Sequence, residues 1–199
     1  AGLPRIYGVA WAYVAHTDGA FDEDMLVQFL VAYQETRELN LSEMWALPTT
    51  LRVVLIENLR RLAERVATYK AAREVANLYS DHIDRYSEDT LNELLVLLSL
   101  RGVSKVFLGQ VAQRLRDRKA TGDTGSGQQH IDWLSRKLPD AATVQAQQNA
   151  DQTADNLSVS NAVTSLRDID HADWPDIVAR TSALMRLMLT CSCGCLFSC

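Results

Sequence analysis

Few residues of this 199-residue chain have the type and spacing that catalysis or metal binding requires. Asp168-Ile169-Asp170 matches the Asp-x-Asp with which some sugar-nucleotide transferases hold a divalent metal, but the pattern before it is helical, whereas such a site needs a strand that passes into a loop. A calcium loop beginning at Asp168 also fails, because Asp173 stands where Gly is required and Ala179 replaces the final Glu. The histidines show no zinc-binding spacing, and we expect each to be a surface or capping residue: His16, His82, His130 and His171.

The remaining motifs are also weak, and we expect no catalytic, cofactor-binding or metal-binding residue in this chain. Residues 122–127 are rich in glycine but lack the Gly-Lys-Ser/Thr ending of a phosphate loop, so we interpret residues 119–129 as a flexible linker. No Gly-x-Ser-x-Gly motif is present, and no cysteine lies next to a candidate base.

All four cysteines fall within the last nine residues, at Cys191, Cys193, Cys195 and Cys199. Four thiolates could hold zinc, although the spacing is not that of structural zinc sites. Lipidation is a second interpretation, but Cys199 is the last residue and no C-terminal prenylation box is present. A third is that the tail at 191–199 is not native sequence. All three interpretations stay open.

Composition limits the class of protein. A hydrophobic fraction of 47% and a charged fraction of 23% are typical of a globular chain and exclude global disorder. The net charge of −5 argues against a nucleic-acid binder. The longest strongly apolar run, residues 94–98, is far short of the ~20 residues that span a bilayer. We therefore expect an intracellular chain with no transmembrane segment.

Helical apolar spacing recurs along the chain, and no segment alternates with period two. We predict an all-α array of roughly six to eight helices, with a helical domain at 1–118 and a second helical segment at 130–190 on either side of the linker. The predicted helices cover residues 4–16, 22–33, 51–79, 87–102, 104–118, 131–138, 143–166 and a segment that starts at 173. The predicted caps and starts are Asp22, Ser42, Ser87, Ser104, Thr143 and Asp173, with Pro48 restarting or kinking the chain after a short turn.

The helix at 51–79 is the clearest element. Its apolar stripe comprises Leu51, Leu55, Leu59, Leu62, Val66 and Tyr69, of which we expect the middle four to be core residues. Its basic residues outnumber its acidic ones and could face acidic lipid or a partner: Arg52, Arg60, Arg61, Arg65, Lys70 and Arg73. The alternative is a solvated face with pairs such as Glu57–Arg61 and Arg60–Glu64.

Two blocks resemble the N-terminal region of cyclic β-1,2-glucan synthases, and together with the spacing between them the likeness covers most of residues 2–186. The first runs over residues 3–63 and includes Leu3-Pro4-Arg5-Ile6-Tyr7, His16-Thr17-Asp18-Gly19, Ala32-Tyr33-Gln34, Ser42-Glu43-Met44-Trp45-Ala46-Leu47-Pro48 and Leu55-Ile56-Glu57-Asn58-Leu59-Arg60-Arg61-Leu62. The second comprises Ser158-Val159-Ser160-Asn161-Ala162-Val163-Thr164-Ser165-Leu166-Arg167 and Asp173-Trp174.

The resemblance implies a large bacterial inner-membrane enzyme that builds glucan from UDP-glucose with a membrane-embedded glycosyltransferase domain and carries a phosphorylase-like domain at its far end. The matching region precedes the membrane helices, so no catalytic residue transfers to this chain, and the sequence departs from the family after about Leu189. We expect a truncated, non-catalytic, cytoplasmic segment at the inner membrane, inactive alone, whose partner is the remainder of the polypeptide or its membrane complex. A free-standing helical interaction module, with or without a metal-binding Cys tail, is the alternative.

Overall fold

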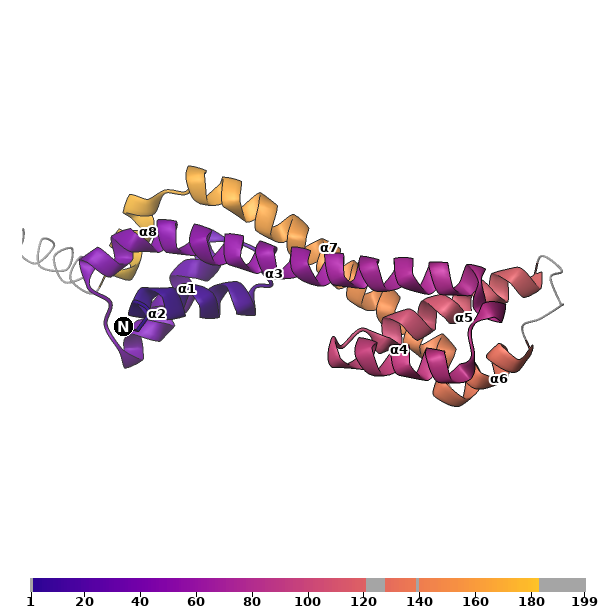
Figure 1. Ribbon diagram of the computed structural model, residues 1–199. Coiled ribbons are helices and arrows are strands. Elements are labelled where there is room, and N and C mark those ends of the chain that lie inside the picture. Colours follow the sequence, from indigo (N-terminus) through magenta and orange to yellow (C-terminus); the bar gives the residue numbers. More distant parts are fainter. Residues whose placement is uncertain (1, 121–127, 139, 183–199) are drawn as a thin grey trace, which may run out of the picture. The chain divides into compact units, whose positions relative to one another are not determined.

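The computed structural model describes residues 2–120, 128–138 and 140–182, which are helical almost throughout and contain no strand (Figure 1). The prediction of an all-α fold is thereby confirmed. The central linker residues 121–127, the apolar positions Leu184 and Leu187 and the cysteine tail lie outside the described residues. The helices, with a single 3-10 turn η1 among them, are α1 Arg5–His16, α2 Glu23–Thr36, α3 Leu41–Asp81, η1 Ile83–Arg85, α4 Glu88–Leu100, α5 Ser104–Ala120, α6 Gln128–Lys137, α7 Ala141–His171 and α8 Trp174–Thr181.

Packing divides the chain into two units. Unit 1 combines Ala1–Arg61 with Asp155–Cys199, and unit 2 is the continuous stretch Leu62–Ala154, so that α3 and α7 each contribute to both units. The sequence-based division at residues 119–129 falls inside unit 2. Since most of that stretch lies outside the described residues, the flexible linker stays a prediction.

Unit 1 has a core built from α1, α2, the first half of α3, the end of α7 and α8. Helical spacing predicts one apolar face for α1, and the five residues on it are all buried: Ile6, Val9, Ala10, Tyr13 and Val14. The sequence pattern predicts one apolar face of α2, formed by Met25, Leu26, Phe29, Leu30 and Tyr33. Leu26 and Leu30 are fully buried in α2, but Met25 is 53% exposed, so its place on that face is corrected. The reason is geometric, since the buried residues Leu26, Val27, Leu30 and Gln34 centre on the opposite side of the helix from Met25.

Helix α3 begins earlier than predicted and passes through Pro48 without a break. Asn40, and not Ser42, caps it: the Asn40 side-chain oxygen accepts from the Glu43 amide at 2.8 Å, and the Glu43 carboxylate accepts from the Asn40 amide at 3.0 Å. This reciprocal pair is a capping box. Leu47 and Leu51, on either side of Pro48, are both 1% exposed, and their burial holds the helix together across the proline.

The apolar stripe of α3 is only partly a core stripe. Leu55 and Leu62 are buried and Leu59 packs half-buried on the unit 1 core, but Val66 is 47% exposed, so its assignment to the core was wrong. After Leu62 the next buried α3 residue is Ala72, which belongs to a different packed cluster. The apolar spacing therefore continues through Val66, although residues 63–68 of α3 are all exposed.

Unit 2 packs α4, α5 and α6 around Phe107 and Trp133, which are 0% and 1% exposed. Ser87 caps α4 as predicted, accepting from the Thr90 amide at 3.2 Å. The cap predicted at Thr143 is wrong, because the Asp140 carboxylate accepts from the Thr143 amide at 3.1 Å and α7 begins at Ala141. Hydrogen bonds from the Thr143 side chain and backbone lower the pKa of Asp140.

Candidate functional site

The turn between α1 and α2 is the most distinctive polar feature of unit 1, because it is seated directly on α7. Asp18 has φ 51° and Gly19 φ 77°, so two consecutive residues adopt the left-handed conformation. The Ser158 hydroxyl donates to the Asp18 carboxylate at 2.7 Å, and the Asn161 side-chain amide donates to the Asp18 carbonyl at 3.3 Å. Residues about 140 positions apart in the chain are thus joined by side chains of α7.

Ser165 completes this contact one turn further along α7. Its hydroxyl, 2% exposed as a residue, donates to the Gly19 carbonyl at 2.8 Å and accepts from the Phe21 amide at 2.8 Å. A Cβ placed on Gly19 would be 3.7 Å from the Cβ of Ala162, so the turn approaches α7 closely. We name the set Asp18, Gly19, Phe21, Ser158, Asn161 and Ser165 the turn joint.

The other side of the same turn is fixed by Tyr13. Its hydroxyl donates to the Asp22 carbonyl and accepts from the Asp22 amide, both at 3.1 Å, and burial raises the pKa of this tyrosine. Asp22 then caps α2, as predicted, by accepting from the Met25 amide at 2.8 Å. The polar groups around the turn therefore form hydrogen bonds within the chain, which indicates a structural role for them.

A second buried polar contact ties α2 to α8. The side-chain amide of Gln34, 9% exposed, donates to the Thr181 carbonyl at 2.9 Å, and its oxygen accepts from the Leu39 amide at 3.3 Å. Gln34 thus satisfies the backbone where α8 ends and where the chain leaves α2. No pattern in the sequence around Gln34 predicts this role.

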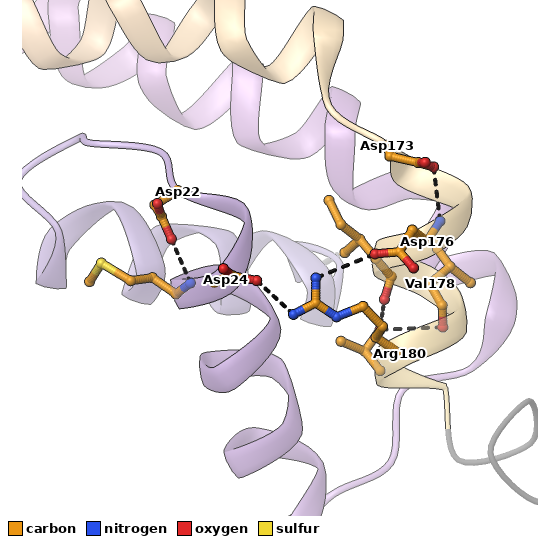
Figure 2. Close-up of polar contacts among 9 residues, drawn as sticks. Asp22, Asp24, Asp173, Asp176, Val178 and Arg180 are labelled. Carbon is orange, nitrogen blue, oxygen red and sulfur yellow. Dashed lines mark hydrogen bonds and ion pairs between the residues drawn. The ribbon is translucent and has the colours of Figure 1, made fainter.

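Figure 2 shows how charge supplements this α2–α8 contact. The Arg180 guanidinium lies between two carboxylates, donating to Asp24 at 2.7 Å and to Asp176 at 3.3 Å, and these bonds raise its pKa. Asp173 caps α8 as predicted, accepting from the Asp176 amide at 3.0 Å. All of these side chains are exposed, so they contribute orientation more than stability.

The two carboxylates of the Asp-x-Asp motif lie on different sides of α7. Asp168 and Asp170 are exposed on α7 while Ile169 between them is buried, and on a helix two such carboxylates point about 200° apart. Asp170 forms an ion pair with Arg52 of α3. Among the described residues no group of three or more His, Cys, Asp or Glu side chains could hold a metal ion.

Several basic residues of α3 form ion pairs with neighbouring acidic residues of the same helix. Glu57 accepts from Arg60 at 2.8 Å and, as predicted, from Arg61 at 2.9 Å, and the two guanidinium groups lower the pKa of Glu57 to about 2. Arg61 also stacks over the Trp11 ring, 4.6 Å from its centroid. These contacts favour the solvated-face interpretation over a free cationic surface.

Three of the four histidines occupy the surface or end positions expected of them: His16 ends α1, with its Nδ1 2.8 Å from the Ala12 carbonyl oxygen, and His82 and His171 are exposed at helix ends. His130 does not. It is 7% exposed in α6, its Nε2 is 3.3 Å from the Tyr86 carbonyl oxygen, and its Nδ1 is buried without a partner. Its spacing to Trp133 and Leu134, both buried, was the signal for this burial.

In the described parts of the chain, no helix combines the length and the apolar composition that a bilayer span needs.

No family model matches the chain, but a curated protein is similar to it over most of its length. The relative is a glucan synthase of a bacterium, and the likeness runs through both packed units. It is the cyclic beta-(1,2)-glucan synthase NdvB of Rhizobium meliloti (strain 1021), 34% identical over an alignment of 193 residues, and the match covers 92% of this chain. The resemblance predicted from the sequence is confirmed. The chain spans 7% of the length of that relative.

Proposed function

We propose that this chain is the non-catalytic N-terminal helical segment of a cyclic β-1,2-glucan synthase, held at the cytoplasmic face of the bacterial inner membrane. The remainder of the synthase polypeptide or its membrane complex is its partner. In this proposal, synthesis of glucan from UDP-glucose takes place in domains that this chain does not contain.

The turn joint carries the proposal. The strings that first suggested a glucan synthase, His16-Thr17-Asp18-Gly19 and residues 158–167, come from opposite ends of the chain and contact each other through Ser158, Asn161 and Ser165. These three side chains form hydrogen bonds within the chain, so they hold the two strings together. This supports a scaffold role.

Sugar transfer from a nucleotide sugar needs groups that stabilise the departing diphosphate and a base for the acceptor hydroxyl. The proposal assigns these groups to the rest of the synthase. It also gives the charged residues of α3 and α8 a structural role. Arg52 of α3 pairs with α7, Glu57 pairs within α3, and Arg180 of α8 pairs with α2.

The test replaces the matching segment of a full-length cyclic β-1,2-glucan synthase by residues 1–189 of this chain. Membranes are assayed for glucan made from labelled UDP-glucose, after immunoblotting for equal enzyme. We expect the chimera to be active, a synthase without the segment to be inactive, and Ser165→Val to lower the activity of the chimera. Ser160→Ala, an exposed position on the same helix, is the matched control and should leave activity unchanged. Full activity without the segment contradicts the proposal.

A second arm examines the isolated chain. Purified residues 1–199 are incubated with labelled UDP-glucose and Mg²⁺ or Mn²⁺, and the products are scored for glucan or protein-linked sugar. We expect no turnover. Turnover that is lost on Asp168→Ala or Asp170→Ala would show that the chain itself is a transferase and that the Asp-x-Asp motif was dismissed wrongly.

A further inference from the structure

Helix α4 presents an unusual apolar face to solvent. Val96 and Leu97 are each 62% exposed and Leu100 is 81% exposed, the highest value for a large hydrophobic side chain in the described residues. The three lie within two turns and on one side of the helix. We call Val96, Leu97 and Leu100 the α4 face.

The exposure is not a consequence of a loosely held helix. Ser87 caps the start of α4, and Leu91 and Leu95 on its opposite side are buried in the unit 2 core with α5. Gly102, with φ 70°, ends the helix one residue after Arg101. A helix that is anchored on one side and strongly apolar on the other has the pattern of a contact surface.

Charges of opposite sign lie on the two sides of the α4 face. Glu93 stands four residues before Leu97 and Arg101 four residues after it, and both are exposed. Within the described part of the chain neither side chain makes an ion pair. Along the helix axis an acidic residue is therefore followed by the apolar residues and then by a basic residue. A second copy in the antiparallel orientation places opposite charges next to each other.

We propose that the α4 face binds a second copy of this chain, with the two α4 helices antiparallel about a two-fold axis at Leu97. In such an isologous contact, a residue a given number of positions after Leu97 meets the residue the same number before it. Glu93 of each copy then meets Arg101 of the other, forming two ion pairs. Leu100 enters the space between Glu93, Val96 and Leu97 of the other helix.

Charge selects this arrangement over its alternatives. A parallel pairing of α4 helices would place Glu93 beside Glu93 and Arg101 beside Arg101, and like charges across an interface disfavour it. A basic or an acidic partner would satisfy only one end of the face. The contact is small, so we expect a weak dimer, with a dissociation constant on the order of 10–1000 µM. The inference does not depend on the proposed function.

The experiment is sedimentation of the full chain over a wide concentration range, in reducing agent so that the cysteine tail cannot cross-link it. We expect a monomer–dimer equilibrium that the double variant Leu97→Gln/Leu100→Gln weakens by about tenfold or more. Leu157→Gln is the matched control, because Leu157 is 58% exposed and belongs to unit 1, whereas the α4 face belongs to unit 2. It should leave the equilibrium unchanged, and circular dichroism should show that every variant stays helical.

A charge exchange tests the antiparallel register. Arg101→Glu alone places four carboxylates around the contact and should weaken the dimer by about tenfold, and Glu93→Arg should act likewise. The double variant Glu93→Arg/Arg101→Glu restores both ion pairs in reversed sense and should restore dimerisation. A chain that is monomeric at all concentrations overturns the proposal, and so does a dimer that ignores Leu97 and Leu100. Failure of the double exchange to restore the dimer overturns the antiparallel pairing.

Discussion

Removing one hydroxyl from the turn joint should destabilise unit 1 measurably. Ser165→Ala deletes the group that accepts from the Phe21 amide and donates to the Gly19 carbonyl. Gly19 is buried and Phe21 is half-buried, so neither backbone group regains a full water shell. A buried polar group left without a partner costs about 1–3 kcal/mol, and we take the loss for the two groups together as about 2–4 kcal/mol.

The substitution also has a favourable component that a control must remove. Alanine favours a helix over serine by about 0.5 kcal/mol, so the net free energy of unfolding should fall by about 1.5–3.5 kcal/mol. Ser160→Ala on the exposed side of α7 carries the same helix preference without the hydrogen bonds. We expect that control to be neutral or stabilising by about 0.5 kcal/mol.

Urea unfolding followed by tryptophan fluorescence is the appropriate assay, since three of the four tryptophans belong to unit 1: Trp11, Trp45 and Trp174. Circular dichroism at the same urea concentrations checks that helix is lost with the fluorescence change. If Ser165→Ala and Ser160→Ala unfold within about 0.5 kcal/mol of each other, the hydroxyl is not holding the turn and the reasoning is refuted.

Three further substitutions probe other parts of the fold. Gly109→Ala would place a Cβ 3.0 Å from the Gln148 side-chain amide, so we expect no gain in stability, whereas the same change in a Gln148→Ala background should stabilise by about 0.5–1 kcal/mol on urea unfolding. Because the pKa of Glu57 in the folded chain is lowered to about 2 from 4.5, its contribution to the free energy of unfolding is present above pH 4.5 and lost as the pH falls towards 2. Glu57→Gln should make the free energy of unfolding less dependent on pH between these values. A carboxyl NMR titration of Glu57 with a midpoint near 4.5 would contradict this prediction. Val54→Ala, at a fully buried position, should cost about 1–3 kcal/mol in thermal or urea unfolding, while Val53→Ala beside it, 50% exposed, should change stability by less than about 0.5 kcal/mol.

Local features of this chain were predictable from the sequence where one helix decides them. The five buried positions of α1 follow the helical period, and the caps at Asp22, Ser87 and Asp173 precede acidic first turns. The starts of α3 and α7 were missed although a signal was present. Asn40-x-x-Glu43 is a capping-box pattern, and Asp140 stands three residues before Thr143, which is where a cap must be.

Long-range packing could not be predicted in the same way. Val66 continues the stripe of α3, but whether another helix covers it depends on contacts that the period does not contain. The turn joint likewise needs α7 to reach the Asp18-Gly19 turn, and no local pattern specifies that partner. Only the similarity to a known family singled out both strings, and it did so without indicating that they touch.

The discontinuous make-up of unit 1 has a consequence for synthesis on the ribosome. The α1, α2 and early α3 residues emerge first, but Ala162, Ile169, Ile177 and Val178, which belong to the same core, follow the whole of Leu62–Ala154. At 5–20 residues per second, translating that intervening stretch takes roughly 5–20 s, during which the unit 1 core lacks these residues. A nascent chain that has reached Ala154 therefore contains all of unit 2 but only the first part of unit 1, which makes this interval the point at which a chaperone is most needed.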